Sequence, residues 1–373
     1  MVSFAVVSDV HLGHRNTPTD FIIHNLYNYL LSPKRLNELD ILFIAGDLFD
    51  RLLYLPDADA ISTYRFLIKL LRLCSKHDIV LRILEGTPSH DRSQSKLILD
   101  YKESLDIDVD VQYYNDIGYE VIDRLDRLKV VYIPENIRSN VLVTLSEIKH
   151  IYDYERINKA DIVIAHGFHE KQLPYIKNTR HAYTLAQLSS LAEYGVFIGH
   201  VHTRTRYDNV YAQGSFDRLK FGEEENKGYY YGILDKATYQ FDCKFIVNEN
   251  AMIYKTYDLR NDQNIDGLLK RIAQNSTLYH NYRFIIDQDS SSDIYQKLMY
   301  YKTKTVARKY VIEIKLEEAP IEVSTIDTYE TIEINATTLP DILSHRLQEM
   351  NYKHHMRCLE KFKKLDELKS SIS

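Results

Sequence analysis

The chain has 373 residues, of which 45% are hydrophobic and 27% charged, as in an ordinary globular protein with enough apolar residues for a core. This length exceeds one average domain and predicts two, with residues left over for an appendage. The formal net charge of −6 excludes a basic surface over the whole molecule and argues mildly against tight DNA binding. No apolar run approaches the roughly 20 residues that span a bilayer, so we expect no membrane association.

The three cysteines, Cys74, Cys243 and Cys358, lie far apart and form no CxxC pair. A disulfide framework or a zinc module is therefore not expected. Few and scattered cysteines are typical of proteins in a reducing cytoplasm, so we expect a cytoplasmic protein, in the host cytoplasm if the protein is viral.

Residues 1–200 alternate short apolar runs with segments of helical periodicity, the pattern of an α/β fold. The runs are rich in Val and Ile and predict buried strands. These strands are Val2–Ser8, Ile41–Ala45, Val80–Leu84, Lys129–Ile133, Ile162–Ala165 and Val196–Ile198. Helices are predicted between them, with Thr19-Asp20 capping the first. The helices are Phe21–Leu31, Ala58–Ser75, Asn140–Tyr152 and Thr184–Tyr194.

The pattern changes after Gly199. Asn209–Phe216, Gly228–Leu234 and Phe241–Val247 are predicted as successive antiparallel strands, which makes the sheet mixed. The polar, unpatterned stretch Asp258–Asn264 indicates a domain boundary.

The rest of the chain predicts a small α+β domain and then helices. The strands expected in the domain are Arg283–Ile286, Tyr310–Leu316 and Thr331–Ile334, and its helices are Gly267–Ala273 and Asp293–Tyr300. From Leu339 onward the chain is polar, with apolar residues spaced by three or four, which predicts helix. We therefore expect an α/β domain with a mixed β-sandwich flanked by helices at 1–255, a small α+β domain at 256–337 and a helical segment at 338–373.

Five short polar motifs each follow closely on an apolar run. They are Asp9-Val10-His11, Gly46-Asp47-Leu48-Phe49-Asp50, Ser89-His90-Asp91, Ala165-His166-Gly167 and Gly199-His200-Val201-His202. Strand ends and the loops after them form the crevice where open α/β sheets bind ligands. The motifs offer oxygen and imidazole nitrogen but no sulfur, which suits Mn²⁺, Fe²⁺ or Zn²⁺. Because the set exceeds what one ion can use, it predicts a two-metal site that splits phosphate esters.

The spacing within the motifs supports metal binding. Asp9 and His11 are two residues apart, so on an extended segment they share one face and can hold one ion; His200 and His202 repeat this spacing. A single D-x-H or H-x-H usually belongs to a surface loop, and Gly-Asp after a strand is often only a turn. The specific signal is the order of all five motifs on separate strand ends.

This order resembles the calcineurin-like metallophosphoesterases. Four further sequence features are similar to the SbcD-type DNA nucleases within that superfamily. They are Ser8-Asp9-Val10-His11-Leu12-Gly13, Gly214-Ser215 followed by Arg218, Phe221-Gly222-Glu223 and Lys227-Gly228. The resemblance covers roughly residues 1–250 by motif, and beyond them only the general layout matches.

The resemblance implies roles for residues of the motifs. One metal ion would be held by Asp9, His11, Asp47 and His202, with Asp47 bridging to the second ion. The second would be held by Asp47, the position of Ser89, His166 and His200. His90 would be the histidine that stabilises the transition state or protonates the leaving oxygen, and Asp91 would orient its imidazole.

One motif departs from the family. The family has Gly-Asn-His-Asp or Gly-Asn-His-Glu, whereas this chain has Gly86-Thr87-Pro88-Ser89-His90-Asp91. We predict that Ser89 binds the second ion, directly or through water. The alternative is a weaker second site that fills when substrate binds.

The resemblance also implies an activity and partners: a two-metal, Mn²⁺-dependent double-strand DNA exonuclease and single-strand endonuclease. The chain would be the nuclease subunit of an SbcC–SbcD-like complex, with a capping, DNA-binding domain at 256–337, an ATPase-binding segment at 338–373 and a homodimer of the nuclease subunit. The partners would be DNA and an SbcC-like ATPase of the SMC family. Arginines near the motifs are candidate contacts to the DNA backbone, although each one alone is more often a solvated surface residue. They are Arg15, Arg51, Arg92, Arg204 and Arg218.

Two other hypotheses stay open. A small-molecule phosphodiesterase or phosphoprotein phosphatase uses the same dinuclear core. A non-catalytic scaffold would keep the fold and lose the chemistry, and the intact Asp9, Asp47, His90 and His202 count against it.

Overall fold

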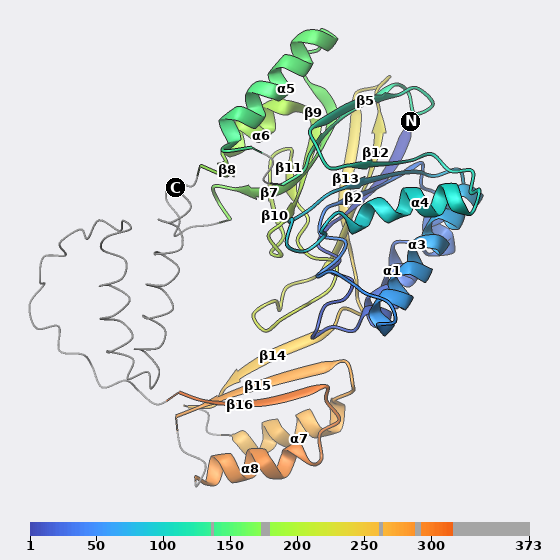
Figure 1. Cartoon of the computed structure of the whole chain (residues 1–373). Helices are drawn as coiled ribbons and strands as arrows, with labels where there is room; N and C mark the ends of the chain where they lie inside the picture. Colours follow the sequence, from blue (N-terminus) through green and yellow to red (C-terminus); the bar gives the residue numbers. More distant parts are fainter. Residues whose placement is uncertain (136–137, 173–179, 261–263, 288–291, 316–373) are drawn as a thin grey trace, which may run out of the picture. The chain divides into compact units, whose positions relative to one another are not determined.

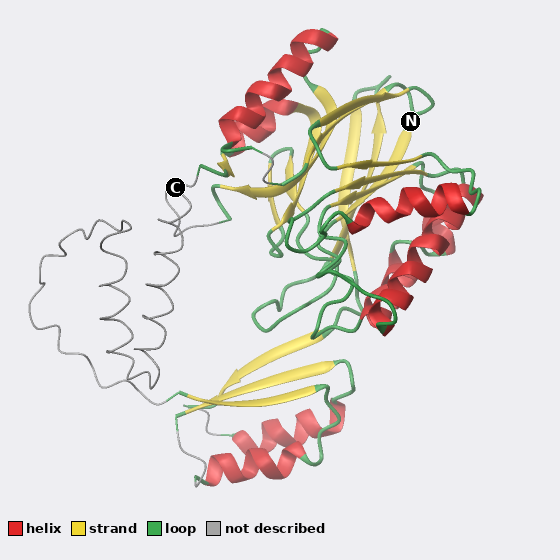
Figure 2. Cartoon of the chain, in the orientation of Figure 1, coloured by secondary structure: helices red, strands yellow, loops and turns green. Residues whose placement is uncertain are grey.

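The computed structural model describes residues 1–135, 138–172, 180–260, 264–287 and 292–315. The expected strand Thr331–Ile334 and the expected helical segment at 338–373 lie outside these ranges. The described residues form two larger sheets, covered by helices, and one small sheet (Figures 1 and 2).

The first large sheet has the strand order β13-β12-β1-β2-β3-β4. Strands β1 (Val2–Val7), β2 (Ile41–Ala45), β3 (Val80–Leu84) and β4 (Val111–Tyr114) run parallel. On the other side of β1, β12 (Gly228–Asp235) and β13 (Gln240–Val247) continue the sheet in antiparallel fashion. The predicted mixed sheet is confirmed for Gly228–Leu234 and Phe241–Val247, but the predicted strand Asn209–Phe216 belongs to the second large sheet and does not pair with them.

The second large sheet has the order β10-β11-β9-β7-β6-β5. Its parallel strands are β6 (Leu128–Ile133), β7 (Ala160–His169), β9 (Ala192–His200) and β11 (Val210–Ala212). At one edge, β5 (Gly118–Ile122) pairs with β6 in antiparallel fashion, and at the other edge β10 (Thr205–Tyr207) pairs with β11 in the same way. The short β8 (Ala182–Tyr183) pairs in parallel with β7.

The two large sheets pack face to face because their strands alternate two apolar faces. In β1, Phe4 and Val6 face the second sheet and pack with Phe197 of β9, while Ala5 and Val7 belong to the core on the helix side. The rings of Phe4 and Phe197 meet edge to face, with centroids 5.5 Å apart. Burying one such side chain stabilises the fold by about 1.5–3 kcal/mol.

Helices cover the outer face of each large sheet (Figure 2). The first sheet is covered by α1 (Thr19–Tyr29), α3 (Ala58–Lys76) and α4 (Leu97–Ser104), and the second by α5 (Val141–Glu155) and α6 (Leu185–Leu191). The short α2 (Pro33–Leu36) and η1 (Gln94–Lys96) lie in connections. The predicted α/β class, with mixed sheets flanked by helices, is confirmed.

The predicted cap of the first helix is wrong. Pro18 occupies the N-cap position and Thr19 is already helical. The Thr19 hydroxyl instead accepts a hydrogen bond from Gly13 N at 2.9 Å, so it holds the loop that carries His11.

The small sheet contains β14 (Ile253–Asp258), β15 (His280–Ile286) and β16 (Lys309–Ile314), all parallel. They are connected by α7 (Ile265–Asn275) and α8 (Asp293–Lys302), which gives a β-α-β-α-β order in which helices and strands alternate along the chain. The predicted boundary between residues 255 and 256 falls inside β14, so this part of the chain begins earlier than expected. Within the described ranges, no helix has the length and apolar character needed to cross a membrane.

Candidate metal centre

The loops that carry the predicted motifs adopt strained backbone conformations. Asp9, His11, Asp47 and His200 have φ angles of 50°, 53°, 50° and 101°. Such angles are uncommon for residues other than glycine and cost of order 1–3 kcal/mol each, and they gather at functional sites. The loops after β1 and β2 hold each other in place, because Val10 N and His11 N both donate to Asp47 O, at 2.9 and 3.0 Å.

Glycines let the loops approach the centre closely. A Cβ on Gly46 would lie 2.2 Å from His166 Nδ1, and one on Gly199 would lie 2.7 Å from Ala45 O. Neither position has room for a side chain, so glycine at these two sites permits the contact between the sheets.

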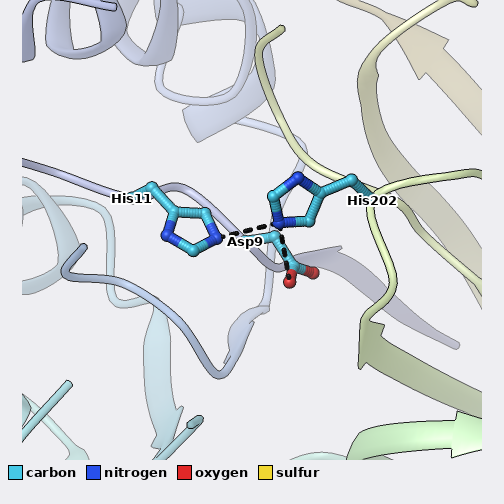
Figure 3. Close-up of side chains that lie close together, drawn as sticks. All are labelled: Asp9, His11 and His202. Atoms are coloured by element: carbon cyan, nitrogen blue, oxygen red, sulfur yellow. Dashed lines mark hydrogen bonds and ion pairs between the residues drawn. The ribbon is translucent and has the colours of Figure 1, made fainter. Parts of the chain in front are cut away.

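The first cluster contains Asp9, His11 and His202 (Figure 3). The Nε2 atoms of His11 and His202 are 3.1 Å apart, and His202 Nε2 is 4.0 Å from Asp9 Oδ1. The other ring nitrogens lie against carboxylates: His202 Nδ1 is 2.7 Å from Glu223 Oε1, and His11 Nδ1 is 3.2 Å from Asp50 Oδ1. A carboxylate at Nδ1 favours the tautomer whose Nε2 is free to bind a metal ion.

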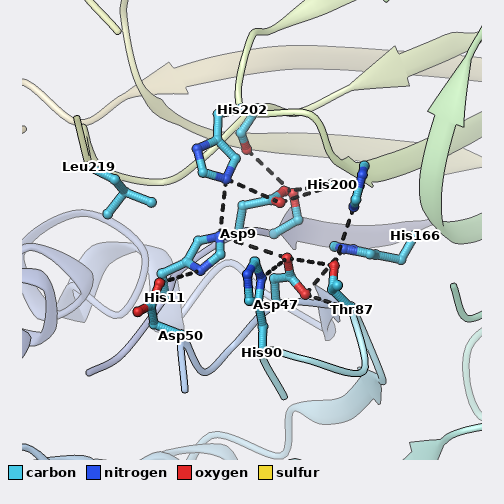
Figure 4. Close-up of polar contacts among 12 residues, drawn as sticks. Asp9, His11, Asp47, Asp50, Thr87, His90, His166, His200, His202 and Leu219 are labelled. Carbon is cyan, nitrogen blue, oxygen red and sulfur yellow. Dashed lines mark hydrogen bonds and ion pairs between the residues drawn. The ribbon is translucent and has the colours of Figure 1, made fainter. Parts of the chain in front are cut away.

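The second cluster contains Asp47, His166 and His200 (Figure 4). His166 Nδ1 lies 2.7 Å from Ala45 O and must donate to that carbonyl, so in the neutral ring Nε2 is the acceptor. This Nε2 is buried, has no hydrogen-bond partner and lies 3.3 Å from Asp47 Oδ1. An orphaned buried nitrogen facing a carboxylate is what a metal ion would satisfy, so the donor set fits divalent cations.

Asp47 lies between the two clusters. Its Oδ2 is 3.8 Å from His11 Nε2, and its Oδ1 faces His166. Burial alone would raise the pKa of Asp47, but the surrounding imidazoles, His166 first, hold it well below its usual range. Burial alone would lower the pKa of His166, but the Asp47 carboxylate outweighs it and raises the pKa to about 10. The two opposite charges stabilise each other, and a metal ion bound at His166 Nε2 would take the place of the proton there.

His90 and Asp91 have other partners than expected. His90 Nδ1 lies 2.9 Å from Asp47 Oδ2, so Asp47, and not Asp91, orients this imidazole. The fully buried Asp91 accepts hydrogen bonds from three backbone N–H groups, those of Gly86 at 2.7 Å, Phe49 at 2.8 Å and Asp47 at 3.1 Å. The Asp91 carboxylate therefore links the loops after β2 and β3 and does not orient the His90 imidazole, which corrects the role predicted for it.

The structure does not bring Ser89 to the centre. The Ser89 side chain is exposed, and its backbone carbonyl accepts a hydrogen bond from Arg92 Nε at 3.1 Å. Pro88 and Ser89 lie in a turn at the surface, so the residue directly after Gly86 takes the inner position. That residue is Thr87, which corrects the prediction made for Ser89.

Thr87 and Glu135 are the two residues of the centre that the sequence did not reveal. Thr87 Oγ1 lies 3.1 Å from Asp47 Oδ2, 2.8 Å from Glu135 Oε2 and 3.3 Å from His200 Nδ1. Glu135 Oε2 also lies 2.9 Å from His200 Nδ1. Two signals were present in the sequence: Thr87 follows Gly86 as asparagine follows glycine in the family motif, and Glu135 comes just after a predicted strand, as the other motifs do.

The predicted DNA-contacting arginines fall into two groups. Arg51 and Arg218 are used inside the fold: Arg51 Nε donates to Gly13 O at 3.0 Å, and Arg218 Nε donates to Glu225 O at 3.1 Å. Arg15, Arg92 and Arg204 are exposed, and the Arg204 guanidinium lies 4.3 Å from the ring centre of Phe245.

Comparison with known proteins leaves the family open. No family model matches the chain, and no curated protein sequence matches it. One similar solved structure is TT1561 of Thermus thermophilus, with 10% identity, a TM-score of 0.37 and coverage of 65% of this chain and 98% of that chain. A second solved structure has 11% identity and a TM-score of 0.36 with the same coverage. The function is therefore argued from the geometry of the site, which is that of a candidate dinuclear metal centre compatible with a metal-dependent hydrolase.

Proposed function

We propose that this protein is a two-metal phosphodiester hydrolase that cleaves DNA, as the resemblance to the SbcD-type nucleases implies. The observation that carries the proposal is the position of Asp47 between two clusters of metal-binding side chains. Two divalent ions bound there, Mn²⁺ in our proposal, would supply positive charge to the phosphoryl oxygens and lower the pKa of a water molecule.

The proposal assigns metal binding and proton donation to different side chains. Asp9, His11 and His202 hold one ion, His166 and His200 the other, and Asp47 contributes to both. His90 is the residue placed to touch the substrate, because 37% of its side chain is exposed while its Nδ1 is bound to Asp47. The hydrogen bond to Asp47 raises the pKa of His90. In our proposal His90 Nε2 gives a proton to the leaving sugar oxygen.

A nuclease assay tests the proposal. Purified protein is incubated with linear duplex DNA, and separately with single-stranded circles, in Mn²⁺, beside Asp47→Ala and His90→Ala. We expect degradation by the wild type and loss of at least about 100-fold in both variants. If the wild type leaves DNA intact, even with an SbcC-like ATPase and ATP, but cleaves a cyclic nucleotide or a phosphoprotein, the nuclease proposal fails.

The partners are part of the same proposal. The segment at 338–373, which the sequence predicts to be helical, would bind an SMC-like ATPase, and the nuclease subunit would form a homodimer. Co-purification of the full chain, and of a chain ending at residue 337, with the ATPase tests the first point. Equal capture of both chains would refute it.

A further inference from the structure

We infer that Glu135 is a direct ligand of the second metal ion. Glu135 lies two residues beyond the end of β6, and the neighbouring strand β7 carries His166. Glu135 Oε2 lies 3.6 Å from His166 Nε2. The inference rests on the proposed function, because it assigns a ligand to the dinuclear centre proposed above.

Distances within the cluster support a ligand role. A cation with ligands at about 2.1 Å keeps neighbouring ligand atoms about 3.0 Å apart in an octahedron and about 3.4 Å apart in a tetrahedron. Glu135 Oε2 lies 2.9 Å from His200 Nδ1 and 3.6 Å from His166 Nε2, and His166 Nε2 lies 3.3 Å from Asp47 Oδ1. These three distances are those of neighbouring ligand atoms in one coordination shell.

A second observation points to an ion at this position. His166 Nε2 is buried without a hydrogen-bond partner, and its ring is fixed because Nδ1 is used by Ala45 O. Glu135 Oε2 and Asp47 Oδ1 both face this nitrogen, although neither can donate a proton to it as a carboxylate. A cation among the three atoms would give His166 Nε2 the partner that it lacks.

The alternative role for Glu135 is to orient His200 by accepting a hydrogen bond from its Nδ1. In that role Glu135 would affect only the position of the His200 imidazole. A ligand role makes the affinity for the ion depend on the charge of Glu135, because a neutral amide oxygen binds a hard cation more weakly than a carboxylate does. The Thr87 hydroxyl, 2.8 Å from Glu135 Oε2 and 3.1 Å from Asp47 Oδ2, would hold both carboxylates in place.

The substitutions that test the inference are Glu135→Gln and Glu135→Asp. Glu85→Gln is the matched control, because Glu85 is a buried glutamate near the same loops whose carboxylate accepts from Ser93 N at 2.7 Å and Tyr113 Oη at 2.7 Å. Ser89→Ala controls for the exposed serine of the motif. Thermal unfolding of each metal-free variant establishes that it is folded.

Mn²⁺ binding by the full-length protein without DNA is the readout, measured by calorimetry and by the electron paramagnetic resonance signal of free and spin-coupled Mn²⁺. We expect two ions on the wild type. In Glu135→Gln the second should bind at least about tenfold more weakly and the spin-coupled signal should fade, while the first changes less than about threefold. Glu135→Asp should weaken the second ion less than Glu135→Gln, and both controls should stay within about twofold of the wild type.

The inference is overturned if Glu135→Gln takes up both ions within about twofold of the wild type, if Glu135→Asp is the weaker of the two variants, or if the wild type binds fewer than two ions. DNA cleavage is measured in parallel and answers a separate question. Wild-type protein whose second Mn²⁺ depends on Glu135, but which cleaves no DNA, would support the ligand and refute the nuclease.

Discussion

Replacing Glu223 by glutamine should damage the first metal site without touching a ligand. Glu223 is 5% exposed, and its two oxygens accept from two different donors: Oε1 lies 2.7 Å from His202 Nδ1, and Oε2 accepts from Leu219 N at 2.9 Å. A glutamine side chain has one oxygen and one NH₂ group, so it can serve only one of these donors.

Both orientations of the amide are unfavourable. If its oxygen faces His202, the NH₂ group meets Leu219 N and leaves that donor unpaired, at about 1–3 kcal/mol of stability. If its NH₂ group faces His202, Nδ1 must become an acceptor, and the proton moves to the Nε2 that should bind the ion. Loss of such an outer carboxylate typically weakens metal affinity roughly 10–100-fold, which is about 1.4–2.8 kcal/mol.

The assay combines Mn²⁺ calorimetry with urea unfolding of the metal-free protein. Glu225→Gln is the matched control, because Glu225 Oε1 lies 2.7 Å from Lys227 Nζ and its carboxylate is partly exposed. We expect Glu223→Gln to bind the first ion roughly 10–100-fold more weakly and to unfold at lower urea, while Glu225→Gln loses less than about 1 kcal/mol. A Glu223→Gln protein with wild-type stability and wild-type Mn²⁺ affinity would refute the reasoning.

Three further predictions concern the loops and the buried histidines. Gly46→Ala should lower stability by at least about 2 kcal/mol, because alanine is strained at a φ of 85° and its Cβ would meet His166 Nδ1 at 2.2 Å; a wild-type urea midpoint would contradict this. Thr87→Val should weaken Mn²⁺ binding, whereas Thr87→Ser should not; equal affinities in both would exclude a role for the hydroxyl. Burial lowers the pKa of His169 to about 4, so the neutral ring contributes stability above pH 6.5 that is lost as pH falls toward 4, by up to about 3 kcal/mol. Urea unfolding in a metal chelator at about pH 7 and about pH 4.5 should show a smaller pH dependence for His169→Gln, and an unchanged dependence would count against this assignment.

The sequence predicted the buried strands well, because their signal is local. Ile41–Ala45 and Val80–Leu84 were placed at the bounds that the structure has, since strands buried on both faces are continuous apolar runs. It did not predict β4 (Val111–Tyr114), β5 (Gly118–Ile122) or β14 (Ile253–Asp258), which are partly exposed and lack such runs. Their pairing is decided by neighbouring strands that are distant in the sequence.

The sequence by itself determined which ligand types are present and that they follow strands of an α/β fold. The sequence placed four metal-binding candidates at strand ends, because a polar residue directly after an apolar run can be recognised from the sequence alone. They are Asp9, Asp47, His166 and His202. Only the tertiary structure decided which side chains face inward. The turn at Pro88 and Ser89 leaves Ser89 exposed and places Thr87 at the centre. Asp91 accepts hydrogen bonds from the backbone amides of two loops, and the pairing of β6 with β7 brings Glu135 to the centre. These outcomes depend on turn geometry and on the register of strands far apart in the sequence, which no local pattern of residues records.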